Sequence, residues 1–188
     1  MDTMKRWTFA LPALALLLVV PALIALRAGY ASAASAPVTV PSGRAPLAPV
    51  LAAGDWIDGR PTAATVAGKV VVVDVFTVDC GNCQNVVPTL RTLYAADRDR
   101  GLVVIGVHSP ETPPEKDRSY VTDSLRRQGI VWPVAVDNEF NLWTAYGVSA
   151  WPTELFFDRH GRLRGTITGD SQDDSVKSTV AALLAERG

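Results

Sequence analysis

Residues 69–83 constrain the fold of this chain more than any other part of its sequence. Residues 69–76 read K-V-V-V-V-D-V-F, a nearly unbroken run of β-branched residues. Such a run is typical of a strand covered on both faces, because a strand with one face in water alternates apolar and polar side chains. The sequence C-G-N-C follows at residues 80–83, where a helix is predicted to begin at Gly81. We therefore expect two cysteines between a buried strand and the N-terminus of a helix.

The rest of the chain predicts an α/β domain with a mixed sheet. The helix after the cysteines extends to about Arg100, with a kink at Pro88 because proline removes a backbone hydrogen bond. Turn residues at 158–161 predict a hairpin, and Ser171 is the predicted N-cap of the last helix. Strand, helix and strand followed by a hairpin and a helix is the pattern of such a domain. The further elements are strands at 102–107, 133–136, 155–157 and 163–168, and helices at 115–128, 140–146 and 171–184.

An apolar run near the N-terminus predicts export. A Lys-Arg pair precedes a mostly apolar segment at 7–26, which as a helix would span about 30 Å, the thickness of one bilayer core. Positive charge before such a segment keeps the N-terminus in the cytoplasm and sends the following domain across. We expect a single-pass membrane anchor within residues 1–28, with the domain on the extracytoplasmic side. Cleavage of a signal segment near Ala33 or Ala36, at A-x-A sites, is the alternative.

Composition separates a linker from the folded domain and excludes several kinds of protein. Residues 29–49 are rich in Ala, Ser, Pro and Gly and are predicted to be a flexible linker, which leaves residues 50–188 as the folded domain. The chain has 18 basic and 19 acidic residues, a balance that excludes a mainly electrostatic nucleic-acid binder. Two cysteines and two histidines exclude a disulfide-rich scaffold and a four-cysteine zinc site. We predict no metal site.

The position of the cysteines predicts thiol chemistry. Free N–H groups and the macrodipole at a helix N-terminus stabilise a thiolate, the reactive form of cysteine. Cys80 ends the turn before the helix and is the predicted nucleophile, whereas Cys83 lies one turn in and is the predicted resolving thiol. A structural disulfide, stabilising by about 2 kcal/mol, a metal site and a thiol peroxidase stay open. The peroxidase pattern T-x-x-C fits residues 77–80, but Val73 stands where that pattern expects a proline.

These residues resemble the thioredoxin family. The strand end at 73–76, the C-G-N-C sequence and Pro88 are similar to the family's redox motif, and G-V-S-A-W-P-T at 147–153 resembles its cis-proline loop. The N-terminal segment and the W-I-D-G sequence at 56–59 point to the extracytoplasmic TlpA/ResA branch. The resemblance covers about residues 54–186. More specifically, three segments resemble the thioredoxin-like domain of DipZ-type proteins: residues 101–111, 132–138 and 143–147.

The resemblance implies a thioredoxin fold and thiol–disulfide oxidoreductase activity, with reduction of disulfides as the expected direction. No organic cofactor is implied, because the dithiol itself carries the two electrons. The implied electron donor is a CcdA-type membrane protein, and the implied substrates are exported thiol or disulfide proteins such as apocytochromes c. Trp151 and Pro152 are expected to line the substrate edge, with a cis bond before Pro152. A copper-handling module of similar fold is a further alternative, although such modules generally carry C-x-x-x-C.

Two acids are candidates for assisting the thiols. Asp74 lies in the run of valines, and burial there raises the pKa of a carboxyl, which suits a proton acceptor for Cys83. A structural acid bonded to a nearby side chain is the alternative. Glu111 follows a strand end, and the resemblance to ResA-type proteins implies that an acid on this loop aids the thiol pair. An ordinary loop carboxylate is the other interpretation.

Two residues beside the cysteines depart from the family's pattern. Asp79 stands where thioredoxins usually have tryptophan, and Asn82 replaces the usual proline. Both are predicted to tune the reduction potential and docking. A negative charge on Asp79 disfavours a thiolate on Cys80, which destabilises the reduced form and makes the dithiol a stronger reductant. The alternative is that Asp79 points away from the sulfur and serves docking to a partner.

Overall fold

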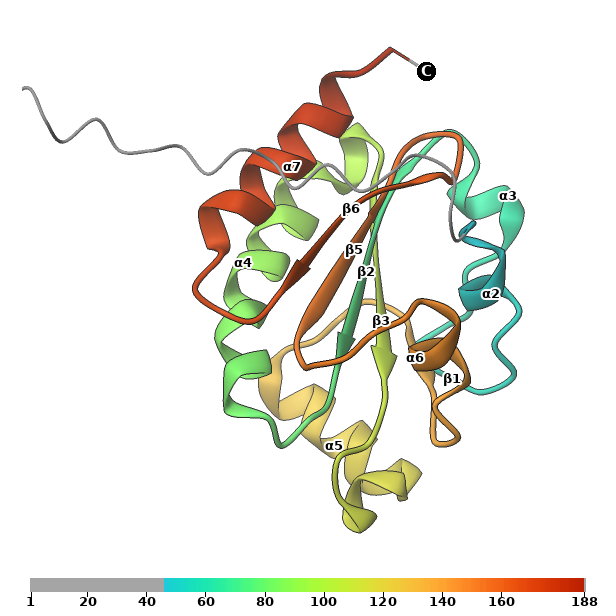
Figure 1. The fold of residues 1–188 in the computed structure, drawn as a ribbon, viewed down its shortest axis with the longest axis vertical. Coiled ribbons are helices and arrows are strands. Elements are labelled where there is room, and N and C mark those ends of the chain that lie inside the picture. Colours follow the sequence, from blue (N-terminus) through green and yellow to red (C-terminus); the bar gives the residue numbers. More distant parts are fainter. Residues whose placement is uncertain (1–45, 188) are drawn as a thin grey trace, which may run out of the picture. The chain divides into compact units, whose positions relative to one another are not determined.

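A mixed sheet of six strands organises the computed structural model, which describes residues 46–187. The strands are β1 (Trp56–Ile57), β2 (Val70–Phe76), β3 (Leu102–His108), β4 (Val134–Val136), β5 (Thr153–Phe157) and β6 (Leu163–Thr168). Their order is β1-β4-β3-β2-β5-β6 (Figure 1). β2, β3 and β4 run parallel, whereas β1, β5 and β6 pair antiparallel with their neighbours. The predicted mixed sheet is therefore confirmed.

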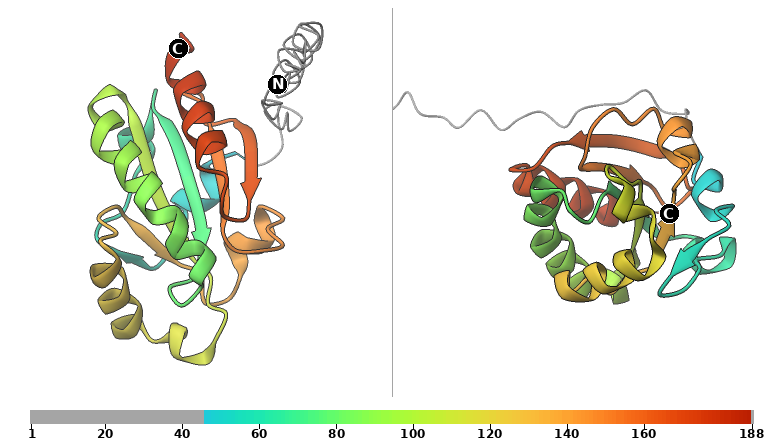
Figure 2. Two further views of the ribbon diagram at one scale, coloured as in Figure 1. Left: turned by 90° about the vertical axis from the view of Figure 1, so that its left-hand side faces the viewer. Right: turned by 90° about the horizontal axis from the view of Figure 1, so that it is seen from below.

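Helices cover both faces of this sheet. One face is covered by α4 (Gly81–Asp97), α5 (Arg118–Gln128) and α7 (Asp173–Ala185). Figure 2 shows α4 and α7 side by side along the sheet. The opposite face carries three short helices, α2 (Ala48–Leu51), α3 (Ala63–Val66) and α6 (Asn141–Ala145). Two 3-10 helices, η1 (Arg98–Arg100) and η2 (Pro113–Lys116), follow α4 and β3.

β2 lies in the interior of the sheet, and all of its residues are buried, as its β-branched run predicts. It pairs in parallel with β3, from Val70 opposite Leu102 to Phe76 opposite His108. Because the carboxyl ends of these two strands meet at one edge, the turn into α4 and the loop after β3 lie close together there. In Figure 1 this edge is at the lower end of the sheet.

The predicted elements are present in the structure, and some of their boundaries differ from the prediction. α4 begins at Gly81 and contains Pro88, and η1 continues the helical segment to Arg100. β5 begins at Thr153, earlier than the strand predicted from residue 155. The charged helix predicted from Glu115 begins later, as α5, because Asp117 caps its first turn by accepting a hydrogen bond from the Tyr120 N–H.

The predicted N-cap at Ser171 is wrong. Ser171 has a left-handed backbone, with a φ of 61°, whereas an N-cap residue is normally extended. Gln172 occupies the N-cap position of α7, and its side chain makes no capping hydrogen bond. The acidic first turn, with Asp173 and Asp174, is confirmed and complements the helix dipole.

The folded part of the chain begins before the boundary predicted at Val50. Leu47 is only 5% exposed, and its N–H donates to the Gly161 carbonyl at 3.3 Å. α2, β1 and α3 were not predicted, because each is too short to show a hydrophobic period. The predicted anchor and the cleavage sites near Ala33 and Ala36 lie outside the described residues. Within residues 46–187, no helix is both long and apolar enough to cross a bilayer.

Candidate active site

Cys80 and Cys83 lie at the N-terminus of α4, at the edge where β2 ends. Cys80 is the N-cap residue of the helix, and its Sγ accepts a hydrogen bond from the Cys83 N–H at 3.2 Å. Both thiols are free; Cys80 is half-buried, and Cys83 is 4% exposed. A helix N–H directed at sulfur stabilises a thiolate. The arrangement agrees with Cys80 as the accessible nucleophile and Cys83 as the inner thiol.

The Cys83 thiol holds its proton firmly. Burial raises the pKa of Cys83, and the hydrogen bond and charge of Cys80 and the charge of Asp74 raise it further. Cys83 packs in the core beneath α4, among side chains that include Val86 and Leu90. A thiol in such a place attacks a disulfide only when a base receives its proton.

Asp74 is a buried carboxyl on β2. It is 3% exposed, and burial raises its pKa to about 7. The Oδ1 atom has no hydrogen-bond partner among the described residues. The predicted burial of Asp74 is therefore confirmed. Its charge acts on Cys83, which places the two groups within electrostatic range. Its role as proton acceptor stays a prediction.

Glu154 is a second buried carboxyl, which the sequence reasoning missed. It lies on β5 directly opposite Asp74, and it is completely buried. Burial, and then the charge of Asp74, raises the pKa of Glu154 to about 9. A signal was present in the sequence: Glu154 alternates with Phe156 along an apolar segment, so both belong on one face of a strand. The predicted strand began one position too late to include it.

A third buried acid, Glu115 of η2, holds the turn between β2 and α4. Its carboxylate accepts hydrogen bonds from the Thr77 hydroxyl and from the Asp79 N–H at 3.0 Å. It also accepts the N–H groups of Glu111 and Thr112, each at 2.7 Å. Burial alone raises the pKa of Glu115, but these hydrogen bonds hold it below its usual value. A carboxylate whose ionised form is stabilised by hydrogen bonds therefore ties the loop after β3 to the turn that presents Cys80.

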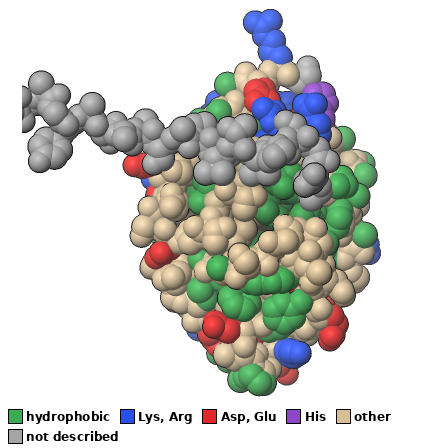
Figure 3. All heavy atoms as spheres, viewed as in Figure 1, with side chains coloured by type: hydrophobic (Ala, Val, Ile, Leu, Met, Phe, Trp, Pro, Cys, Tyr) green, Lys and Arg blue, Asp and Glu red, His purple; other side chains and the backbone are tan. Residues whose placement is uncertain are grey.

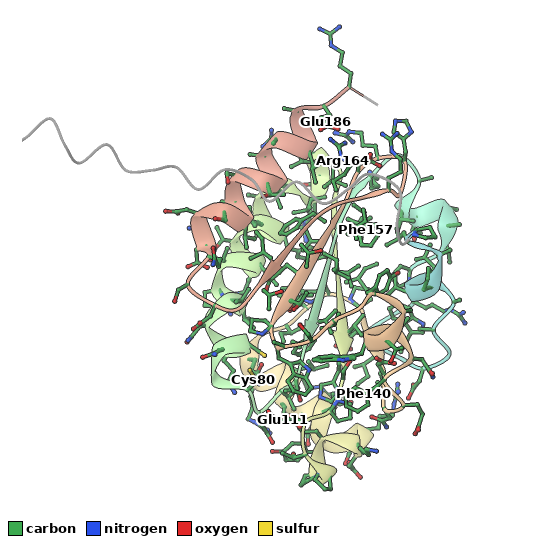
Figure 4. All side chains as sticks on the ribbon, in the orientation of Figure 1. Cys80, Glu111, Phe140, Phe157, Arg164 and Glu186 are labelled. Carbon is green, nitrogen blue, oxygen red and sulfur yellow. The ribbon has the colours of Figure 1, made fainter. Side chains whose placement is uncertain are left out.

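The side chain of Glu111 is exposed, whereas that of Glu115 is buried. Figure 4 shows Glu111 at the same end of the molecule as Cys80. The group of Glu111 that reaches the buried network is its backbone N–H, not its carboxylate. Its predicted action on the thiol pair stays a prediction. Sequence reasoning selected Glu111, whereas the structure buries Glu115 of the same loop.

Neutral side chains also form hydrogen bonds or close contacts with the turn between β2 and α4. The Val78 carbonyl accepts hydrogen bonds from the side-chain amides of Gln84 and Gln128, at 3.0 and 2.8 Å. His108, at the end of β3, is fully buried, and its Nε2 lies 3.5 Å from the Thr77 hydroxyl. Burial lowers the pKa of His108 to about 4, so the ring is neutral at physiological pH. These contacts fix the backbone on which Cys80 lies.

Asp79 and Asn82 are both exposed beside the cysteines. The Tyr120 hydroxyl donates to the Asp79 carboxylate, with both oxygens at 2.9 Å. This hydrogen bond raises the pKa of Tyr120. The charge of Asp79 is thus partly satisfied by a side chain of α5, and its effect on the redox pair stays a prediction.

The loop before β5 carries the predicted substrate edge. The Trp151–Pro152 bond is cis, as predicted. Trp151 is half-buried and packs on Trp143, with ring centroids 4.5 Å apart, and Trp143 contacts Phe140 edge-on at 5.9 Å. We call these three rings the aromatic patch. Figure 3 shows hydrophobic side chains gathered on this face, in the region where Figure 4 places Phe140.

Comparisons with known proteins identify related sequences and structures. The sequence model of a family described as Redoxin matches residues 59–184. Protein DipZ of Mycobacterium bovis is 37% identical over 120 residues, which cover 64% of this chain and 17% of that protein. The thiol-disulfide oxidoreductase ResA of Geobacillus thermodenitrificans is 25% identical over 128 residues, covering 68% of this chain and 71% of ResA. A crystal structure of a thiol-disulfide isomerase from Corynebacterium glutamicum superposes with a TM-score of 0.67 at 28% identity, covering 73% of this chain and 95% of that one.

These comparisons test the resemblance drawn from the sequence. They confirm the thioredoxin-like fold and the relationship to DipZ and ResA. The matched part of this chain spans less than a fifth of the length of DipZ. Among residues 46–187, no group of three or more His, Cys, Asp or Glu side chains is placed to hold a metal ion.

Proposed function

Because this chain belongs to the Redoxin family of thioredoxin-like proteins, we propose that it is an extracytoplasmic thiol–disulfide oxidoreductase that reduces disulfides in exported proteins. The observation that carries this proposal is the pairing of two unequal thiols at one helix N-terminus. Cys80 is half-buried and receives a backbone hydrogen bond, whereas Cys83 is buried and retains its proton. This inequality is what a two-step exchange needs.

The exchange proceeds through a mixed disulfide. The Cys80 thiolate attacks one sulfur of the substrate disulfide, forms the new S–S bond and releases the other substrate sulfur as a thiolate. The Cys83 thiol then gives its proton to Asp74 and attacks the Cys80 sulfur. The second substrate sulfur leaves, the Cys80–Cys83 disulfide forms, and two electrons have passed to the substrate. The released thiolates take up protons, including the one held by Asp74.

The aromatic patch and Pro152 supply the surface for the substrate. An extended substrate segment would lie along the backbone of residues 150–152, as in strand addition. Apolar rings beside that backbone suit segments exposed in incompletely folded proteins. The substrates proposed are exported thiol or disulfide proteins, for example apocytochromes c, and the electron donor proposed is a CcdA-type membrane protein. The apolar N-terminal run supports the extracytoplasmic location, and the relationship to ResA, a thiol-disulfide oxidoreductase, supports thiol or disulfide proteins as the class of substrate.

Three assays on the full chain test the proposed chemistry. Reduction of insulin disulfides by the reduced protein is expected, and it should vanish in Cys80→Ser and fall strongly in Cys83→Ser. Consumption of hydrogen peroxide without insulin reduction would favour a peroxidase. Tight binding of Cu(I) without insulin reduction would favour a copper-handling module. Protein alkylated at both thiols is the control for each assay.

Location needs a separate experiment. In intact cells, a thiol reagent that cannot cross the membrane should label the reduced protein, because the domain is proposed to lie outside the cytoplasm. Labelling that occurs only after the cells are lysed would contradict the proposed location and leave the thiol chemistry intact.

A further inference from the structure

Two buried carboxyls face each other beneath the redox helix. β2 and β5 pair antiparallel, with Asp74 opposite Glu154. Alternation along each strand places Asp74 on the same face as Val72, and Glu154 on the same face as Phe156. Val72 and Phe156 both belong to the core beneath α4 and α7, which also contains Cys83. The two carboxyls and the inner thiol therefore share one side of the sheet.

These two carboxyls have few hydrogen-bond partners to offset the cost of their burial. Both oxygens of Glu154 and Oδ1 of Asp74 lack hydrogen-bond partners among the described residues. Native proteins normally pair such buried atoms, since an unpaired one carries its full desolvation cost. A protonated carboxylic acid carries much less of this cost than a carboxylate. Retaining two acids here therefore calls for a role beyond packing.

The groups around Asp74 and Glu154 also favour the protonated form of these carboxyls. Glu154 is influenced by Asp74 on β2 and by Asp173 at the start of α7, and both are acids. On α4, the titratable group that the charge of Asp74 influences is Cys83. On β6, the residue opposite Glu154 is the apolar Ile167. Two adjacent carboxyls that lack a cation cannot both ionise readily near neutral pH.

We propose that Asp74 and Glu154 form one carboxyl pair that receives the proton of the Cys83 thiol, with Glu154 as a positioning residue that acts through Asp74. This inference rests on the proposed function and deepens it. Near neutral pH, Glu154 keeps its proton and leaves Asp74 free to ionise. During resolution, the Cys83 proton moves to Asp74, the S–S bond to Cys80 forms, and the substrate thiolate leaves. Ionisation of Glu154 at alkaline pH places a second negative charge near Cys83 and opposes formation of its thiolate.

A single-turnover experiment isolates this step. The full chain is reacted with Ellman's reagent so that thionitrobenzoate is attached to Cys80, and its release by Cys83 is followed across the pH range. In the native sequence we expect the release rate to rise with the first ionisation of the pair and to fall by about threefold after the second. Glu154→Gln should keep the rise and lose the fall.

Further variants keep the test decisive. Glu154→Met, also neutral, should behave like Glu154→Gln, and Glu139→Gln, which changes an exposed acid, should retain the native profile. Asp74→Asn should lose the rise near neutral pH and show one titration from Glu154 at a lower pH than the native second step. Identical profiles for the native protein and both Glu154 variants would overturn the proposal. Insulin reduction is measured in parallel: its failure in the native protein refutes the proposed function, whereas unchanged pH profiles refute only the carboxyl pair.

Discussion

At the scale of single residues, the difference in exposure between Cys80 and Cys83 predicts a division of labour. Cys83→Ser should trap a mixed disulfide with a substrate protein, because the thiol that resolves it is gone. Cys80→Ser should form none, because Cys83 is buried and burial keeps its thiol protonated. Limiting iodoacetamide on the reduced protein, followed by peptide mass analysis, should find Cys80 labelled first. Preferential labelling of Cys83 would reverse the two roles.

Asp79 carries the second prediction at this scale. The sequence predicts that its charge acts on the redox pair; if so, Asp79→Asn should raise the reduction potential by up to about 30 mV, an amount that screening by solvent reduces. The hydrogen bond from Tyr120 partly satisfies that charge. Tyr120→Phe should therefore shift the potential in the opposite direction. Equilibration with glutathione buffers measures both shifts.

A potential that is unchanged in both Asp79→Asn and Tyr120→Phe would exclude the electrostatic role. Docking to a partner would then be the remaining explanation for Asp79. Asp99→Asn, which changes an acid whose side chain is 92% exposed, serves as the control for a general effect of net charge.

At the scale of elements, η2 and the turn from β2 into α4 form one unit through Glu115. Glu115→Gln replaces one carboxylate oxygen by an amide that cannot accept N–H groups. Each hydrogen bond lost to a charged acceptor costs about 1.5–3 kcal/mol, so the free energy of unfolding should fall by about that amount or more. Disulfide exchange should slow as well, because the remaining amide oxygen cannot serve both the Asp79 N–H next to Cys80 and the N–H groups of the loop after β3.

Glu111→Gln is the matched control, because Glu111 lies on the same loop and is exposed. Its stability should stay within about 0.5 kcal/mol of the native value. Denaturant unfolding measures stability in both variants. A decrease in exchange rate for Glu111→Gln without loss of stability would support the role implied for Glu111 by the resemblance.

At the scale of the whole molecule, buried acids with opposite pKa shifts set the pH dependence of stability. Burial raises the pKa of Asp74 from 3.8 to about 7 and that of Glu154 from 4.5 to about 9. Their folded forms bind protons more tightly than the unfolded chain does. The stability they contribute is therefore complete below about pH 4 and is lost as the pH rises through about 7 and about 9. Asp158 acts in the opposite direction: burial alone would raise its pKa, but hydrogen bonds led by those from Arg162 hold it at about 2.

The contribution of Asp158 is present above its unfolded pKa of 3.8 and is lost as the pH falls toward 2. Together these groups predict maximal stability at about pH 4, where the contribution of Asp158 is present and those of Asp74 and Glu154 are still nearly complete. Denaturant unfolding at a series of pH values checks this expectation. Asp74→Asn with Glu154→Gln should flatten the alkaline decline, and Asp158→Asn should flatten the acidic one. Stability that rises steadily from about pH 5 to about pH 9 would contradict the assignment.

The sequence by itself determined the central strand, the redox helix and the place of the thiols between them. The run of valines in β2, the C-G-N-C sequence and Pro88 are properties of contiguous residues, and their conformational preferences act locally. The burial of Asp74 followed for the same reason, since its neighbours in the chain are apolar. The loop ending in Pro152 was found from its resemblance to a known family, and the structure agrees with it.

Only the tertiary structure decided which other residues join this site. Glu154 lies opposite Asp74 through the register of two strands far apart in the chain, and no local pattern specifies a register. Glu115 reaches Thr77 across 38 residues because the ends of β2 and β3 meet at one edge of the sheet. α2 and α3 are stabilised by packing on the sheet and β1 by pairing with β4, and not by their own propensity. In each case the determining interaction joins residues that are distant in sequence, and its energy exists only when the chain has folded.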